Sequence, residues 1–210
     1  MAGAAVQFFF GLGSRYSYLA STQIAQLENE TGCRVQWLPM VSGELMRRRG
    51  QNPFASRTSS GDWSGVSVSG QYSEAYRATD LKRWADLYGV PFQTPKPARM
   101  DERRRTLYCV AAELAGHAAA YCRAMFDAMY VAHIAIGEED CLRLADSIDI
   151  APDFLRSRVD SGEAEKRHDE IVKLAVSKGV FGVPTFICGD ELFWGNDRLV
   201  LLRHRLAKSS

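Results

Sequence analysis

The sequence lacks a Cys-x-x-Cys pair, although its 210 residues include five cysteines. They are Cys33, Cys109, Cys122, Cys141 and Cys188, an odd number at scattered positions. A dithiol redox centre, a disulfide framework and a zinc knuckle all lose support from this arrangement. We therefore expect free thiols in a reducing compartment. The four histidines show no His-x-x-x-His spacing, so we expect no metal site.

Long apolar runs are also missing from the sequence. No stretch reaches the roughly 18 to 20 apolar residues that a membrane-spanning helix needs. The N-terminus has no basic region followed by an apolar segment and a cleavage site, as a signal peptide would. We therefore expect a soluble, cytoplasmic protein that has no membrane partner.

The chain has little net charge, because 26 Lys and Arg residues oppose 25 Asp and Glu residues. This balance argues against a general nucleic-acid binder, which needs a basic excess. Two runs of three arginines, at 47–49 and 103–105, have acids nearby and are expected to be solvated helix faces. The hydrophobic content of 46% is that of a globular protein, and the length predicts one or two domains.

The first forty residues predict a strand, a helix and a second strand. Residues 5–10 form an apolar, aromatic run that stops at a Gly-Leu-Gly turn. Apolar residues then recur at helical spacing from Tyr16 to Leu27, and Gly32 ends the pattern. Residues 34–38 alternate as a strand does, and Pro39 ends them.

From about residue 42 to residue 178 the signals are mostly helical, with Pro152 suited to a first helical turn. The exception is the Ser/Gly-rich stretch 55–70, which predicts a mobile loop. Strand signals return at 185–188 and 192–194, around a Gly-Asp pair typical of a hairpin. Asn196 and Asp197 are then expected to cap a final amphipathic helix.

Three places could carry chemistry. Ser14 would stand at a helix N-terminus, where unpaired N–H groups favour an anion, although it could equally be a simple N-cap. A cis bond between Val183 and Pro184 would turn the chain and expose backbone groups to a site. The segment from Trp194 to Asp197 offers N–H groups and an acid to an amino-acid-like end group, unless it only caps a helix.

Together these motifs resemble the 2-hydroxychromene-2-carboxylate isomerase family, kin of kappa-class glutathione transferases and of the DsbA-like thioredoxin superfamily. Residues 14–20 (SRYSYLA) resemble the family's Ser-Pro-Tyr/Phe-Ser-Tyr-Leu-Ala. Residues 180–185 (VFGVPT) and 194–199 (WGNDRL) match its C-terminal motifs almost letter for letter. Residues 80–85 (DLKRWA) and 88–91 (YGVP) also fit, so the resemblance spans nearly the whole chain.

The resemblance implies an α/β fold: a thioredoxin-like βαβ-αββα domain interrupted by a large, all-helical, DsbA-like insertion. The expected thioredoxin-like part comprises residues 1–41 and 170–210, and the insertion comprises residues 42–169. The family binds glutathione, and Ser14 stands at the position of its catalytic serine. The expected glutathione contacts are Ser14, Asn52, Val183, Trp194, Gly195, Asn196 and Asp197.

The implied activity is a glutathione-dependent cis-trans isomerisation of a small aromatic substrate, by reversible addition of the thiolate. A kappa-like transferase that keeps the thioether is an alternative, and a non-redox binding protein without Cys-x-x-Cys is a second. The missing dithiol argues against a thiol–disulfide oxidoreductase. The resemblance also implies a homodimer, with exposed Tyr, Trp and Met side chains of the insertion as its face.

The chain departs from the family pattern at several places, of which 55–70 and 95–99 would line the pocket of the second substrate. Arg15 replaces the usual proline and could fix an anionic substrate or lie outside the site. The stretch 55–70 is longer than usual, and residues 95–99 (PKPAR) differ. The acid often found at the end of the first strand is absent, with Gly11 near that position. The motifs expected to bind glutathione thus match the family pattern, whereas the segments expected to line the pocket of the aromatic substrate differ from it.

Overall fold

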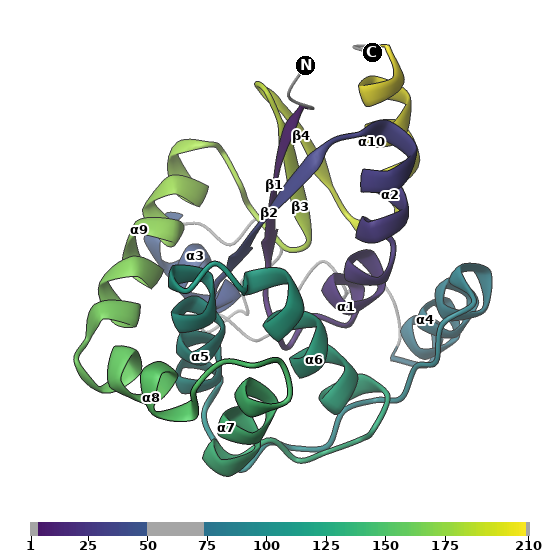
Figure 1. Cartoon of the computed structure of the whole chain (residues 1–210). Helices are drawn as coiled ribbons and strands as arrows, with labels where there is room; N and C mark the ends of the chain where they lie inside the picture. Colours follow the sequence, from purple (N-terminus) through teal and green to yellow (C-terminus); the bar gives the residue numbers. More distant parts are fainter. Residues whose placement is uncertain (1–3, 50–73, 209–210) are drawn as a thin grey trace, which may run out of the picture.

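The computed structural model describes residues 4–49 and 74–208 (Figure 1). Strands β1 (Ala5–Phe10), β2 (Arg34–Pro39), β3 (Thr185–Cys188) and β4 (Glu191–Trp194) form one sheet in the order β2-β1-β3-β4. The first two strands are parallel, and β3 is antiparallel to both β1 and β4. The helices are α1 (Arg15–Thr22), α2 (Ile24–Thr31), α3 (Ser42–Arg49), α4 (Glu74–Tyr88), α5 (Glu102–Leu114), α6 (Ala118–Tyr130), α7 (Glu138–Asp146), α8 (Pro152–Asp160), α9 (Glu163–Ser177), the 3-10 helix η2 (Asn196–Arg198) and α10 (Leu199–Ala207).

Strand β1 is the buried strand that its apolar run predicts. Phe8 and Phe10 are fully buried. The Phe8 ring stacks on Phe186 of β3 with centroids 4.7 Å apart, and the Phe10 ring lies 5.5 Å from Phe126 of α6. Aromatic pairs of this kind contribute about 0.5–1.5 kcal/mol each beyond the area they bury. The sheet and the helical insertion therefore share one core.

The first helical pattern forms two helices. The structure interrupts it at Gln23, whose backbone ends α1 and begins α2. Both helices bury the predicted apolar face, since Leu19 and Ile24 have no exposed surface. Gly32 ends α2 in the left-handed region at φ 68°, as predicted, because glycine has no Cβ to oppose that conformation.

The C-terminal hairpin also follows the sequence. The β3–β4 pair is joined at Gly189 and Asp190 and places Trp194 opposite Thr185. In Figure 1 the sheet stands between α9 on one side and α2 and α10 on the other, while α5–α8 gather at its lower end. The carboxyl end of β1 points toward those insertion helices, so α1 begins where the two parts of the fold meet.

The fold class is confirmed as an α/β, thioredoxin-like domain with a helical insertion, and Pro152 stands in the first turn of α8 as expected. The division into 1–41 plus 170–210 and 42–169 stays a prediction, and its second boundary falls inside α9. All five cysteines are free and buried. No helix in the two described ranges is long and apolar enough to cross a membrane.

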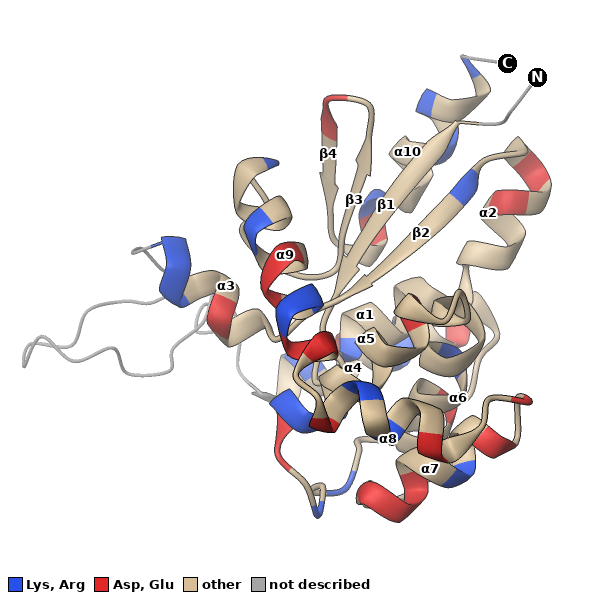
Figure 2. Cartoon of the chain, turned by 60° about the vertical axis from the view of Figure 1, so that its left-hand side comes forward, with Lys and Arg blue, Asp and Glu red and all other residues tan. Residues whose placement is uncertain are grey.

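The two arginine runs differ from each other. Residues 47–49 are exposed at the end of α3 (Figure 2), although Arg48 also pairs with Asp169 of α9 at 2.7 Å. The expectation of a solvated face is wrong for 103–105, where Arg103 joins Glu44 of α3 to Glu165 of α9. Arg104 pairs with Glu138 at 2.9 Å. These ion pairs link helices that are distant in sequence, so neighbouring acids along the chain did not reveal them.

The side chains expected to form a dimer face are mostly covered. Within the described part of the insertion, Tyr76 is 47% exposed, while Trp84 is half-buried. The methionines of α6, Met125 and Met129, are 0% and 4% exposed because they pack into the core. The homodimer stays a prediction, and Trp84 and these methionines do not supply an exposed face for it.

Candidate active site

Ser14 stands at the start of α1. The chain leaves β1 at Phe10, and the backbone N–H of Ser14 donates to the carbonyl of Gly11 at 3.1 Å, which closes the predicted turn. Ser14 is the N-cap of α1, because its Oγ accepts a hydrogen bond from the Ser17 N–H at 3.1 Å. The cap uses a lone pair of Oγ, so the hydroxyl proton can be donated to a group outside the helix.

The bend at Val183 and Pro184 lies beside this turn. The peptide bond between them is cis, and Pro184 is buried. A Cβ placed on Gly11 would stand 3.6 Å from Cγ2 of Val183. Because Gly11 also accepts the hydrogen bond of Ser14, the structure brings the first two predicted motifs together.

The segment from Trp194 to Asp197 reaches the same bend. The N–H of Gly195 donates to the carbonyl of Pro184 at 2.9 Å. Gly195 has φ 110°, and a Cβ there would overlap the carboxylate of Asp197. The positive φ favours glycine at this position, and any side chain there would also have to displace the Asp197 carboxylate. The ring of Trp194 lies 5.1 Å from that of Phe181, which precedes the bend.

The expected capping role of Asn196 and Asp197 is wrong. They begin the 3-10 helix η2, which precedes α10, and neither helix has a side-chain cap hydrogen bond. Asn196 is 4% exposed, and its Nδ2 donates to the Tyr88 hydroxyl at 3.3 Å. Asp197 instead pairs with Arg198 at 2.8 Å. The contact with α4, far away in sequence, determines where the Asn196 side chain lies.

A mixed-charge cluster flanks the start of α1. The Tyr130 hydroxyl donates to the carbonyl of Leu12 at 2.9 Å. Burial raises the pKa of Tyr130, whereas the positive charges of Arg15 and Arg105 oppose that rise. The negative charge of Glu102 adds to it. Arg15 was identified in the sequence because it departs from the family motif. No local sequence pattern predicted that Tyr130 would lie beside the start of α1.

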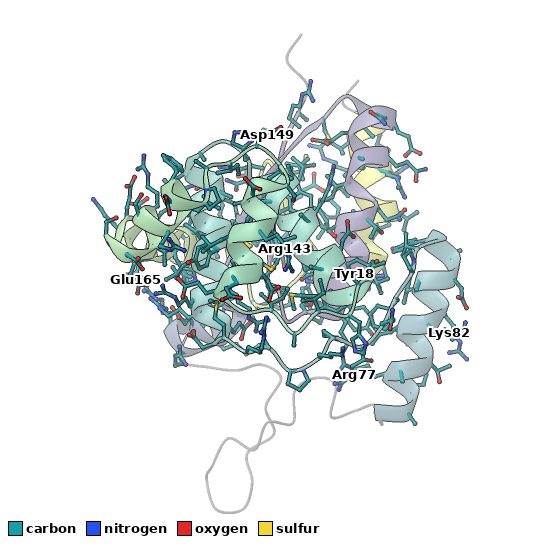
Figure 3. The ribbon with its side chains drawn as sticks, turned by 60° about the horizontal axis from the view of Figure 1, so that its bottom comes forward. Tyr18, Arg77, Lys82, Arg143, Asp149 and Glu165 are labelled. Carbon is teal, nitrogen blue, oxygen red and sulfur yellow. The ribbon has the colours of Figure 1, made fainter. Side chains whose placement is uncertain are left out.

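Two tyrosines fix α1 against the insertion. The Tyr16 hydroxyl donates to Oδ2 of Asp80 in α4 at 2.9 Å, and the Tyr18 hydroxyl donates to the carbonyl of Pro91 at 2.5 Å. Burial raises the pKa of Tyr18 to about 12, so its hydroxyl keeps its proton at neutral pH. Figure 3 looks onto this side of the molecule, with Tyr18 and the α4 residue Arg77 labelled. The first turn of α1 is thus anchored through its side chains.

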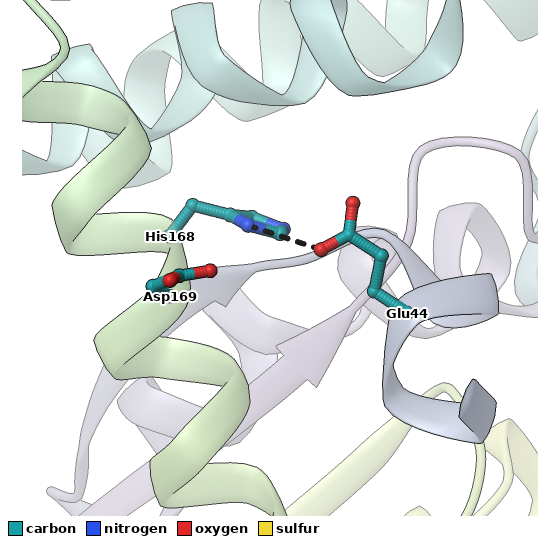
Figure 4. A group of neighbouring side chains, drawn as sticks. All are labelled: Glu44, His168 and Asp169. Atoms are coloured by element: carbon teal, nitrogen blue, oxygen red, sulfur yellow. Dashed lines mark ion pairs between the residues drawn. The ribbon is translucent and has the colours of Figure 1, made fainter. Parts of the chain in front are cut away.

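A second group of polar side chains lies where α3 meets α9 (Figure 4). It comprises Glu44, His168 and Asp169, whose ligand atoms lie within 4.8 Å of one another. The Val41 N–H donates to Nε2 of the fully buried His168 at 3.1 Å, so the proton of the neutral ring is on Nδ1. Burial lowers the pKa of His168 to about 4, with the charge of Arg103 as the next cause.

These residue types could bind a metal ion, but their present partners argue for an ion-pair cluster. Glu44 pairs with Arg103 and with Arg47, the latter at 3.8 Å. Asp169 pairs with Arg48 at 2.7 Å. The guanidinium groups therefore already neutralise both carboxylates, and the Nε2 lone pair of the histidine is occupied by a backbone N–H.

Two sequence expectations lie outside the described residues. Asn52 falls between residues 50 and 73, as does the Ser/Gly-rich stretch 55–70. In the described part of the chain, the start of α1 at Ser14 and the 194–197 segment both lie beside the bend at Val183 and Pro184. Their roles in ligand binding stay predictions.

Comparisons with known proteins agree with the motifs. A family model described as a DsbA-like thioredoxin domain matches residues 5–207. The 2-hydroxychromene-2-carboxylate isomerase of Pseudomonas putida is 29% identical over 204 residues, covering 97% of this chain and 94% of that protein. The isomerase of the same name from Sphingobium xenophagum is 28% identical over 207 residues, covering 96% and 97%.

Solved structures show the same relationship. A structure of 2-hydroxychromene-2-carboxylate isomerase has a TM-score of 0.80 at 28% identity, covering 97% of this chain and 95% of that one. The cytosolic disulfide reductase DsbM from Pseudomonas aeruginosa, solved with GSH, has a TM-score of 0.62 at 17% identity, covering 97% and 99%. The second likeness shows the fold alone. The resemblance read from the motifs is confirmed, and the chain belongs to the family of DsbA-like thioredoxin domains.

Proposed function

We propose that the protein is a glutathione-dependent cis-trans isomerase of an aromatic-catabolic intermediate, of the 2-hydroxychromene-2-carboxylate type. Similarity over nearly the whole chain to proteins of that name supports an isomerase. The observation that carries the glutathione part is the position of Ser14. Its hydroxyl caps α1 through a lone pair, beside the cis bend at Val183, and has a proton to donate.

The residues present fit a bound tripeptide. The carboxylate of Asp197 lies where a Cβ of Gly195 would stand, so the acid and the backbone of this segment lie close together. Asp197 would face the ammonium group of the γ-glutamyl unit, and its pairing with Arg198 leaves it 42% exposed. The backbone of Val183 would pair with the cysteinyl unit. With glutathione bound in this way, the sulfur of its cysteinyl unit would lie over the N-terminal end of α1.

The residues of the chain then have separate tasks. When bound, glutathione supplies a thiolate that adds reversibly to a conjugated carbon of the substrate, so that the former double bond can rotate. Ser14 would donate a hydrogen bond from its hydroxyl to the sulfur, and the positive end of the α1 dipole would favour the thiolate. Arg15 and Arg105 would attract the carboxylate of the substrate, and the rigid attachment of α1 would keep the reacting groups aligned.

A turnover assay tests the proposal. The purified protein receives 2-hydroxychromene-2-carboxylate with glutathione, with S-methylglutathione or with neither, and both substrate geometry and free glutathione are measured. The proposal predicts isomerisation only with glutathione, which is fully recovered. Equal rates without the thiol would reject it. Loss of glutathione into a stable thioether would instead identify a kappa-like transferase.

A further inference from the structure

Ser17 has a buried hydroxyl that no group among the described residues satisfies. It lies in the first turn of α1 with 0% of its surface exposed, and its Oγ has no hydrogen-bond partner in the described part of the chain. Leaving a hydroxyl buried and unpaired typically costs about 1–3 kcal/mol. An alanine would fit the same space without that cost, so the hydroxyl calls for an explanation.

Burial on this helix does not by itself leave a hydroxyl unpaired. Ser21 stands one turn further along α1 and is 3% exposed. Its Oγ donates to the carbonyl of Tyr18 at 2.6 Å. Thr22 likewise donates to the carbonyl of Leu19 at 2.7 Å. These residues bond back to the preceding turn, as serine and threonine in helices often do, whereas Ser17 does not.

Ser17 stands next to the candidate site, three residues after Ser14 in the first turn of α1. In an α-helix the Cα–Cβ bonds tilt toward the N-terminus, which here means toward Ser14. The two residues are already in contact, since the Ser17 N–H donates to Oγ of Ser14 at 3.1 Å. A serine oxygen has two acceptor lone pairs. One of the pairs on Ser14 takes this N–H, and the second can take another donor.

We propose that Ser17 is a positioning residue, whose O–H donates a hydrogen bond to Oγ of Ser14 when the Ser14 O–H donates a hydrogen bond to the sulfur of bound glutathione. This proposal rests on the proposed function. A change of the Ser17 side chain between staggered rotamers would make the bond. Each proton stays on its own oxygen, so nothing is transferred. The Ser17 hydroxyl strengthens the bond that Ser14 makes, because successive hydrogen bonds polarise one another.

The proposal makes Ser17→Ala unlike an ordinary core substitution. The variant loses an unpaired group, so its resistance to thermal unfolding should equal or exceed that of the wild type. At the same time, the thiol of bound glutathione should hold its proton more tightly. We expect about tenfold less thiolate at a pH below its midpoint, which corresponds to one pH unit in that midpoint.

The experiment follows the ultraviolet absorbance of the thiolate in the glutathione complex as a function of pH. It compares the wild type with Ser17→Ala and with the control Ser21→Ala, which also removes a buried hydroxyl from α1. Glutathione affinity is measured by calorimetry so that each complex is saturated. We expect a higher titration midpoint for Ser17→Ala alone, and lower thermal stability for Ser21→Ala alone.

Four outcomes would overturn the proposal. If the wild type and Ser17→Ala share one midpoint, Ser17 does not act on the sulfur. If both alanine variants raise the midpoint equally, the effect is general to α1. If the wild type binds glutathione but leaves its thiol midpoint unchanged from that in free solution, Ser17 has nothing to reinforce. An absence of glutathione binding by the wild type would overturn the proposed function as well.

Discussion

The backbone N–H of Gly195 donates a hydrogen bond to the carbonyl of Pro184 at 2.9 Å. This bond continues the hairpin pairing of Thr185 with Trp194 by one step. It ties the segment after β4 to the cis bend before β3. The two C-terminal motifs recognised in the sequence are therefore parts of one surface, which faces the start of α1.

Replacement of Gly195 tests whether that surface binds the ligand. Gly195→Ala forces a side chain into φ 110° and against the Asp197 carboxylate, at a cost of about 1–3 kcal/mol. We expect lower stability and glutathione affinity reduced at least tenfold. Gly189→Ala is the control, because Gly189 has φ 61° with nothing within 4 Å. It should lose stability and keep its affinity; equal affinities in both variants would contradict the assignment. Chemical denaturation and calorimetry supply the two measurements.

Ser14 can be tested with two variants that separate capping from donation. Ser14→Ala removes both the cap, worth about 1 kcal/mol, and the hydroxyl proton. Ser14→Asp keeps an acceptor for the Ser17 N–H but has no proton to donate at neutral pH. We expect only the alanine variant to lose stability, and both to lose about 10²-fold or more in kcat. Wild-type turnover by Ser14→Asp would exclude the donor role.

Buried His168 makes stability depend on pH. Its pKa is lowered from 6.5 to about 4, mainly by burial, so the unfolded chain binds the proton more tightly than the folded one. Stability is therefore fully present above about pH 6.5 and is lost as the pH falls toward 4, by roughly 1.4 kcal/mol for each pH unit between the folded and unfolded pKa values. Denaturation of wild type and His168→Gln at several pH values measures this difference.

The glutamine variant keeps an acceptor for the Val41 N–H but does not titrate. Its stability should fall less steeply than that of the wild type between pH 6.5 and 4. The neighbouring charged groups, Glu44, Arg103 and Glu165 among them, are present in both proteins. Parallel pH curves for the two proteins would show that His168 takes up no proton on unfolding.

Arg15 is expected to act on the second substrate. Arg15→Gln removes a positive charge beside Tyr130. We expect KM for a carboxylate substrate to rise several-fold, which matches the modest energy of a half-exposed charge, while glutathione affinity stays unchanged. Lys82→Gln is the control, because Lys82 is an exposed cation paired with Asp86 at 2.7 Å on the outer helix α4 (Figure 3). Equal KM values in the two variants would place Arg15 outside the substrate pocket.

The sequence predicted the features that local rules determine. The buried β1 run, Gly32 at the end of α2, Pro152 in the first turn of α8 and the hairpin around Gly189 all appear as expected. Each depends on periodicity or on the conformational freedom of one residue. The motif match also predicted that the segments containing Ser14 and Val183 lie near each other. The fold places those two segments side by side.

Features that depend on distant partners could not be predicted. Asn196 resembles a cap by its type and position, yet a tyrosine 108 residues away holds its side chain. Arg103 resembles part of a solvated run, but acids 59 and 62 residues away bind it. The unpaired hydroxyl of Ser17 is likewise invisible in a motif, because only the packed structure shows which hydroxyls lack partners.

A crystal structure of the protein with bound glutathione tests the central claim most directly. The account predicts the sulfur within hydrogen-bond distance of Ser14 Oγ, the cysteinyl backbone paired with Val183, and the γ-glutamyl end at Gly195 and Asp197. A glutathione molecule bound elsewhere, or with its sulfur turned away from Ser14, would contradict the account.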